Sequence, residues 1–150
     1  MTDNLQEDAV RLTRLNRALR VLSSCNQAML KADEEYALLA DICRILVQEG
    51  GYRMAWVGYA EHDEQKSVRP VAQHGFEEGY LESANITWAD TARGQGPVGR
   101  TIRTGAPVIA QRIRSDPAMA PWLADALRRG YGSLISLPLK TGDETVLGII

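Results

Sequence analysis

The sequence predicts an α+β fold in which an antiparallel β-sheet lies between layers of helices. Segments with strand patterns occur in pairs and alternate with helical segments, which is typical of this fold class. The first strand segment, residues 54–59, is apolar at odd and even positions alike, as expected for a strand covered on both faces. A length of 150 residues suits one domain with a substantial core.

Composition and charge exclude several classes of protein. Charged residues make up 24% of the chain and the formal net charge is -2, with no separate basic run of the kind that binds nucleic acid. No apolar run approaches the roughly 20 residues of a membrane-spanning helix, and the polar, acidic start differs from a secretory signal. Cys25 and Cys43 lie in helical patterns, which argues against a disulfide framework. We expect a cytoplasmic protein.

Residues 1–32 are predicted to form a long helix for signalling and dimerisation. In heptad notation, one seam position holds Leu5, Leu12, Leu19 and Asn26, and the other holds Asp8, Leu15, Leu22 and Met29. A seam with a 3.5-residue period favours pairing with the same helix of a second chain, and Asn26 is suited to fix the register of a parallel dimer. The residues assigned to dimerisation are Leu12, Leu15, Leu19, Leu22 and Asn26. The alternative is a single amphipathic helix lying on its own domain.

The next elements are a helix and a strand pair. Asp33 is predicted to cap the helix, Cys43 lies in its apolar stripe as a small core residue, and Gly50 and Gly51 end it. The polar segment at residues 62–66 then predicts a hairpin loop, and the strand that follows at residues 67–74 contains Pro70. Proline inside a strand places that strand at the edge of a sheet. A polar connector at residues 75–86 contains a helical turn at residues 77–81.

The stretch at residues 92–110 predicts a glycine-rich turn, a short helix and a short strand. Pro97 suits the first helical position, and Gly105 suits a left-handed end. A helix start behind such a turn offers unpaired N–H groups to an anion, and Arg93 and Arg100 are near it in the sequence. The alternative is a loop that only places the helix over the sheet.

The last third of the chain predicts one helix and two strands. Pro121 starts the helix and Gly130 ends it. A strand follows at residues 133–139, and a hairpin turn leads to a final strand from Val146. Because the chain stops inside an apolar run, we expect it to be an N-terminal fragment of a longer protein.

Four stretches, taken together, resemble the GAF domain, a small sensory module of bacterial signalling proteins and cyclic-nucleotide phosphodiesterases. They are YRMAWVG at residues 52–58, GQGPVG and TGAP within residues 94–107, DPAMAPW at residues 116–122, and GYGSLISLPL at residues 130–139. The resemblance assigns residues 33–150 to a GAF domain without its closing helix. It implies a sheet of strand order 2-1-5-4-3, with the N-terminal helices on one face and a ligand pocket on the other.

This resemblance implies a sensory or regulatory domain that binds a small molecule and relays its state through a helical dimer to a downstream output domain. The alternative is a ligand-free dimerisation or spacer module of a multidomain signalling enzyme, of the histidine kinase or diguanylate cyclase type. No catalytic set is evident in this fragment, so we do not expect it to be an enzyme.

The cofactor of such a domain is not identified by the sequence. Covalent bilin attachment and methionine sulfoxide reduction both need pocket cysteines, yet no cysteine follows Cys43. His62 and His74 suit surface positions better than a haem site, and no cluster has metal-ligand spacing. The nucleotide-binding motif of the family would follow Ile150, so a cyclic nucleotide is left open.

By position in the family, nine residues are predicted to line the pocket. Trp88, Gln95, Gly96 and Val98 would form one wall, Asp116 and Trp122 the roof, and Ser136 the floor, while Arg93 and Arg112 would meet an anionic group. A tryptophan could stack on a flat ring. The alternatives are that Trp122 is a core plug and that the arginines are surface charges.

Overall fold

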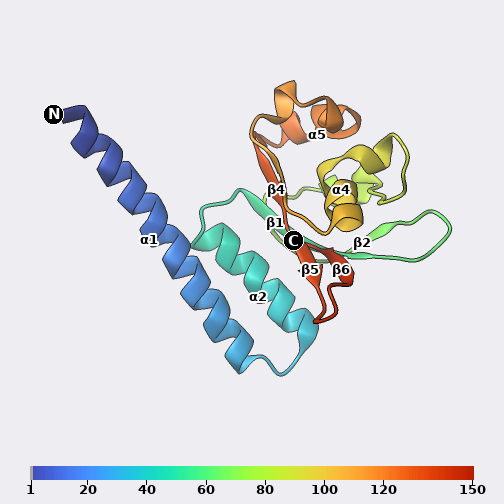
Figure 1. Cartoon of the computed structure of the whole chain (residues 1–150), viewed down its shortest axis with the longest axis horizontal. Coiled ribbons are helices and arrows are strands. Elements are labelled where there is room, and N and C mark those ends of the chain that lie inside the picture. The colour runs from blue at the N-terminus through green and yellow to red at the C-terminus, as the bar shows by residue number, and fades with distance from the viewer. Residues whose placement is uncertain (1) are drawn as a thin grey trace.

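The computed structural model describes residues 2–150, and Figure 1 shows a sheet with helices on both sides. The α-helices are α1 (Thr2–Lys31), α2 (Glu35–Gln48), α3 (Tyr80–Ala84), α4 (Pro97–Thr104) and α5 (Leu123–Arg128). The 3₁₀ helices are η1 (Arg93–Gln95), η2 (Ile113–Ser115) and η3 (Pro117–Trp122). The strands are β1 (Met54–Ala60), β2 (Val68–Gly75), β3 (Val108–Ala110), β4 (Leu134–Ser136), β5 (Pro138–Lys140) and β6 (Val146–Ile149).

The strands confirm the predicted antiparallel α+β class. In the larger sheet the strands lie in the order β2-β1-β6-β5, and each neighbouring pair is antiparallel. β2 is an edge strand, as the proline inside it predicts, because Pro70 has no N–H to donate to a neighbour. β3 and β4 form a separate two-stranded sheet.

The strand predicted at residues 133–139 is divided at Leu137, which corrects the expected strand order. Ser136 pairs with β3, whereas Leu137 exchanges two backbone hydrogen bonds with Ile150, at 2.8 and 3.0 Å. The next residue, Pro138, pairs with β6 and has no N–H to donate. The chain therefore changes partner strand at Leu137, so the single sheet implied by the resemblance is observed as two sheets, β2-β1-β6-β5 and β3-β4.

Two helix starts also differ from the sequence-based expectation. The N-cap of α2 is Glu34, without a side-chain cap hydrogen bond, so the prediction that Asp33 caps this helix is wrong. Pro121 lies inside η3, and the α-helix begins only at Leu123. Proline is compatible with the first turn of an α-helix and with a 3₁₀ turn, and the tighter 3₁₀ turn is observed around Pro121.

The long helix α1 packs against α2 through small side chains. The partly buried residues of this face follow the spacing i, i+3, i+4, i+7 and are Val21, Ser24, Cys25 and Ala28. Ser24 Oγ donates a hydrogen bond of 2.5 Å to Glu49 Oε2, which lies just beyond α2. Figure 1 shows the N-terminal half of α1 projecting beyond the rest of the domain. Only the C-terminal half of α1 is therefore held by the domain.

The predicted leucine seam lies on a different face of α1 and has no cover within residues 2–150. Leu12, Leu15, Leu19 and Leu22 are 54 to 58% exposed, and Leu5 and Met29 are also exposed. The alternative, in which the leucine row packs on its own domain, is not what the structure shows.

The main core lies between the sheet and the layer formed by α3, α4 and α5. Its most buried members come from every part of the domain after α2 and include Trp56, Val68, Tyr80, Ile102, Ile113, Trp122 and Ile149. On the α2 side of the sheet, Cys43, Ile45 and Val57 are buried outside this cluster. Cys43 has no exposed surface, which confirms that it is a core residue. Burial raises the pKa of Cys43 to about 11 and keeps its thiol protonated. In the described part of the chain, none of the helices has the length and apolar character that crossing a bilayer requires.

Candidate functional site

The short helix α4 stands over the sheet on a tightly packed glycine turn. Gly96 is the N-cap of α4 and Pro97 occupies the first turn. At the other end Gly105 is left-handed, with φ 66, and its N–H donates to the Thr101 carbonyl at 2.8 Å. Both ends of this helix are as predicted, because proline and glycine each have the backbone geometry that their position needs.

Arg103 fixes the turn that precedes α4. Its Nη1 donates to the carbonyl oxygens of Trp88, Ala89 and Gly94 at 2.9, 3.0 and 2.7 Å. A Cβ built on Gly94 would lie 1.6 Å from the Ala89 oxygen, so only glycine fits there. The first turn of α4 is buried. The stretch at residues 92–110 therefore agrees with the alternative of a loop that only places the helix over the sheet.

Trp122 fills the space between this turn and the sheet. A Cβ built on Gly96 would lie only 2.4 Å from Cζ3 of the Trp122 ring, so the ring lies directly against the glycine backbone. The Trp122 indole N–H donates to the Ala84 carbonyl at 2.7 Å, and Nη2 of Arg93 donates to the same oxygen at 2.7 Å. The Arg93 guanidinium also lies 5.5 Å from the centroid of the Trp122 ring, within cation–π range.

The cavity that remains beside Trp122 has a volume of about 30 Å³. It is lined mainly by apolar and aromatic residues: Trp56, Tyr80, Ile86, Arg93, Gly96, Pro97, Val98, Gly99, Met119, Trp122 and Leu134. Of these lining residues, Arg93 alone carries a charge. A space of this size holds about one water molecule, so in the described conformation this cavity has no room for a nucleotide or a tetrapyrrole.

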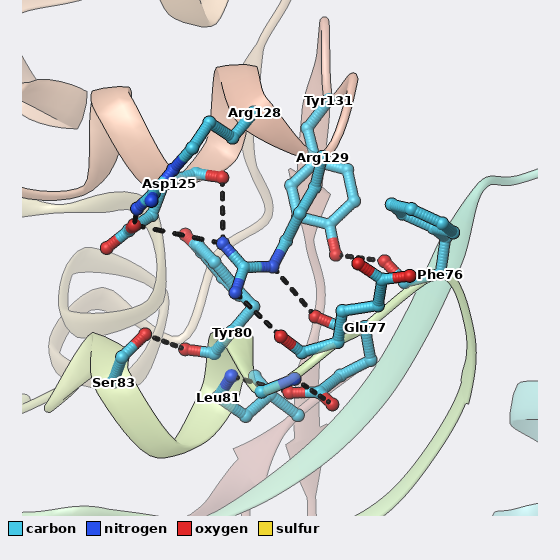
Figure 2. A network of polar contacts seen from close by, with 11 residues as sticks. Phe76, Glu77, Tyr80, Leu81, Ser83, Asp125, Arg128, Arg129 and Tyr131 are labelled. Carbon is cyan, nitrogen blue, oxygen red and sulfur yellow. Dashed lines mark hydrogen bonds and ion pairs between the residues drawn. The ribbon is translucent and has the colours of Figure 1, made fainter.

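Arg129 directly follows α5 and joins it to the loop before α3. This loop, residues 76–79, is called the roof below. Figure 2 shows its guanidinium lying between the loop before α3 and α5. Arg129 donates to the carbonyl oxygens of Glu77, Glu78 and Asp125 at 2.9, 2.7 and 3.0 Å. Glu78 adopts a left-handed backbone with φ 44, which is costly for a residue with a side chain. The hydrogen bonds from Arg129 help to hold this loop in place.

Tyr80 of α3 connects this roof to the cavity. Its ring meets the Tyr131 ring edge-on at 5.3 Å and lies 5.5 Å from the Arg129 guanidinium. Burial, with a smaller contribution from the neighbouring Tyr131, raises the pKa of Tyr80 to about 12. The phenol therefore stays neutral at physiological pH and presents an uncharged surface to the cavity.

The fold and this roofed cavity agree with the sequence comparison. A family model described as GAF domain matches residues 32–150. The chain belongs to the GAF domain family. The resemblance predicted from the four stretches is thus confirmed. A comparison with curated proteins gave no match.

Solved structures with a similar fold include GAF domains and an enzyme. The GAF domain of A. aeolicus nlh2, in an inactive state, is 18% identical with a TM-score of 0.64, over 89% of this chain and 78% of that chain. The GAF domain of a phosphoenolpyruvate-protein phosphotransferase from Coxiella burnetii is 15% identical with a TM-score of 0.65, over 88% and 76%. Free methionine-R-sulfoxide reductase from Neisseria meningitidis, in complex with its substrate, is 13% identical with a TM-score of 0.62, over 91% and 72%. At these identities the likeness concerns the fold alone.

Four of the nine predicted pocket residues line the cavity of this GAF domain: Arg93, Gly96, Val98 and Trp122. The other five do not: Trp88, Gln95, Arg112, Asp116 and Ser136.

The residues outside the cavity have other partners. The Trp88 indole N–H donates to the Glu61 carbonyl at 2.8 Å, and Gln95 donates to Asp90 at 2.7 Å. Asp116 caps η3 by accepting from the Ala118 N–H at 2.9 Å. Arg112 is exposed. The side chains of Trp88, Gln95 and Asp116 thus stabilise the surrounding loops instead of lining the cavity.

Ser136, which was expected to form the floor of the pocket, is buried but does not line the cavity. It is 2% exposed, and within residues 2–150 its Oγ has no hydrogen-bond partner. Its carbonyl accepts a 3.4 Å hydrogen bond from Thr101 Oγ1.

Sequence reasoning missed several residues of the wall, among them Trp56, Tyr80 and Met119. Successive strand residues face opposite ways, so Trp56 and its buried neighbour Val57 had to lie on different faces of the sheet. This alternation was an available signal for Trp56. Tyr80, Leu81 and Ala84 are buried along one side of α3, and this short apolar row was overlooked inside a polar connector.

Both cysteines of this GAF domain lie in α1 and α2, away from the cavity lining. Burial, and to a lesser extent the charge of Glu49, raises the pKa of Cys25. Neither thiol is therefore placed or activated for chemistry at the cavity.

Proposed function

We propose that this GAF domain is a dimeric regulatory module of a signalling protein, in which two copies associate through the leucine seam of α1. The single observation that carries the proposal is the exposure of that seam: Leu12, Leu15, Leu19 and Leu22 are each more than half exposed. Contiguous apolar surface of this kind on a folded domain marks an interaction site. The 3.5-residue period of the row favours another helix as the partner.

The packing of α1 on α2 supports the same proposal. Small residues occupy the face toward α2, so the leucine seam can meet a partner without releasing α1 from its own domain. Burying a leucine side chain contributes about 1.5–3 kcal/mol relative to leaving it in water. Because the four leucines of each helix are a little more than half exposed, each would contribute about half of this amount, and together they are comparable with the cost of association.

A route from the cavity to the dimer supports a regulatory role. Trp56 of β1 lines the cavity, and its neighbour Val57 is buried on the side of the sheet that carries α2. The helix α2 in turn packs against α1. A change in the cavity that moves β1 would thus bias the position of α2 and, through it, the helix pair.

Sedimentation equilibrium tests the dimer. We expect the wild-type chain to dimerise and the Leu19→Asp variant to be monomeric, because a carboxylate in the seam cannot be buried without a partner. Thr13→Asp is the matched control, since Thr13 is exposed on α1 outside the seam. A monomeric wild type, or equal masses for the two variants, contradicts the proposal.

A small-molecule sensor is the second candidate, and the position of Trp122 is the observation that favours it. The indole fills a site with a carbonyl acceptor at Ala84 and a cation at Arg93, so a flat ring that displaced the indole would find both groups. The small residual cavity supports the ligand-free alternative for the described conformation.

Two measurements distinguish these candidates. Native mass spectrometry of the purified domain detects a retained small molecule, which the sensor predicts and the ligand-free module does not. Indole added to the Trp122→Ala variant should raise the melting temperature of the variant more than that of the wild type, because it refills the vacated site. An equal effect on both proteins would contradict the plug role of Trp122.

We propose that this chain is not itself catalytic; within residues 2–150 both thiols lie in α1 and α2, away from the cavity lining. We propose that its output is produced by another domain of the same protein, in the cytoplasm.

A further inference from the structure

We infer that the two copies pair through α1 in antiparallel orientation, with Asp8 of each chain opposite Asn26 of the other. This inference rests on the proposed dimer and adds its register and geometry. It is drawn from the order of residues along the exposed seam and from the part of α1 that the domain leaves free.

The parallel arrangement places identical residues opposite each other. Asp8 of one chain would then face Asp8 of the second chain inside the seam. Asp8 is exposed in the single chain, so association in this orientation would bring the two Asp8 carboxylates together and cover them. Two like charges at seam distance are repulsive, and removing them from water adds a further cost.

The antiparallel arrangement removes this conflict. When the helices run in opposite directions, the row that contains Leu12 in one chain faces the row that contains Leu22 in the other chain. A register centred on residue 17 then brings together complementary pairs. These pairs are Leu5 with Met29, Asp8 with Asn26, Leu12 with Leu22, and Leu15 with Leu19. Every apolar seam residue meets an apolar residue, and the two polar residues meet each other. The Asn26 amide can donate to the Asp8 carboxylate.

The residues beside the seam and the helix dipoles agree with this orientation. Asn16 and Ala18 flank the centre of the register. Both are uncharged, and Ala18 is small enough to let the two helices approach each other closely. Antiparallel helices also align their macrodipoles favourably.

The shape of the domain fits the same orientation. The half of α1 that projects from the domain (Figure 1) is the half that carries Leu5, Asp8 and Leu12. In the antiparallel pair it lies along the domain-held half of the partner helix, on the seam face. The two domains then sit at opposite ends of the helix pair.

Charge substitution at position 26 tests the orientation. In the antiparallel pair, Asn26→Lys creates two symmetry-related ion pairs with Asp8, and the dimer Kd by sedimentation should fall about tenfold, since each exposed pair contributes a few-fold. In a parallel pair the same variant sets Lys against Lys, and the Kd should rise. Circular dichroism checks that the variants keep their helix content.

The double variant Asp8→Asn/Asn26→Lys is the matched control. It keeps the lysine and removes the carboxylate, so in the antiparallel pair the tenfold gain should disappear. A Kd that is unchanged or higher in Asn26→Lys overturns the antiparallel register while leaving the dimer itself in place. A wild-type chain that stays monomeric at every concentration overturns the proposed dimer, so the two failures are distinguishable.

Discussion

The Trp122 ring lies so close to the Gly96 backbone that a Cβ on Gly96 would come within 2.4 Å of it. This contact joins η3 to the N-cap of α4 and closes the cavity. The two segments are far apart in the sequence, so their complementarity is a property of the fold. A substitution at Gly96 therefore tests the packing of the site directly.

We expect Gly96→Ala to lower the free energy of unfolding by about 1–3 kcal/mol, because the added methyl group overlaps the indole. The backbone at Gly96 has φ -64, so the effect comes from packing and not from strain. Gly132→Ala is the control, since a Cβ there would have no atom within 4 Å. Urea denaturation measures both variants. Equal losses would mean that Trp122 can move aside at little cost.

Replacing Arg129 should separate the roof from α5. Arg129→Ala removes three hydrogen bonds to carbonyl oxygens and should cost about 3 kcal/mol, because the left-handed turn at Glu78 loses its support. Arg128→Ala removes an exposed ion pair with Asp125 and should cost at most about 0.5 kcal/mol. Chemical denaturation of the two neighbouring variants gives the comparison. A smaller loss in Arg129→Ala than in Arg128→Ala contradicts the structural role.

The raised pKa of Tyr80 predicts a loss of stability at alkaline pH. Above pH 10 the unfolded chain begins to release the Tyr80 proton while the folded chain, with a pKa of about 12, retains it. The unfolded state then binds fewer protons, so the free energy of unfolding falls as pH rises from 10 to 12, by roughly 2–3 kcal/mol when complete.

Urea denaturation across this pH range checks the Tyr80 prediction. Tyr80→Phe should flatten part of the decline, and the remainder should persist because the pKa of Tyr59 is also raised to about 12. Tyr52→Phe is the control, in which the same hydroxyl is deleted from an exposed position. An unaltered slope in Tyr80→Phe would show that Tyr80 ionises as easily in the folded state as in the unfolded state.

Ser136→Ala should leave stability unchanged or raise it by up to about 1 kcal/mol. The hydroxyl is buried and has no hydrogen-bond partner in the described residues, so its removal also removes an uncompensated desolvation cost. Thr101→Val is the comparison, because the Thr101 hydroxyl donates a hydrogen bond and its loss should destabilise. Thermal denaturation distinguishes them. A loss above 2 kcal/mol in Ser136→Ala would mean that the hydroxyl has a partner.

Local backbone chemistry was the part of the fold that could be predicted from the sequence. Gly105 ends α4 in a left-handed conformation, and Pro70 lies in an edge strand, because each residue limits its own backbone. The division at Leu137 could not be predicted in this way, since it depends on which strands compete for the same segment. The start of α5 was misplaced because Pro121 is compatible with both a first helical turn and a 3₁₀ turn.

The candidate site was predicted less completely than the fold. Gly96, expected in one wall, and Trp122, expected in the roof, both line the observed cavity, whereas a role in binding a ligand stays a prediction. Trp88 and Gln95 are near Gly96 in the sequence, yet their side chains bond to Glu61 and Asp90. The direction of a side chain in a loop is set by partners such as these, and one sequence does not reveal which partner is chosen.

The change of partner strand at Leu137 has a consequence for access to the cavity. β3 and β4 have only three residues each, and so short a ribbon has few bonds to resist opening. Leu134 of β4 belongs to the cavity wall. We therefore expect the amides of this ribbon to exchange with deuterated solvent before those of β1, so that the cavity wall at Leu134 opens before the rest of the sheet.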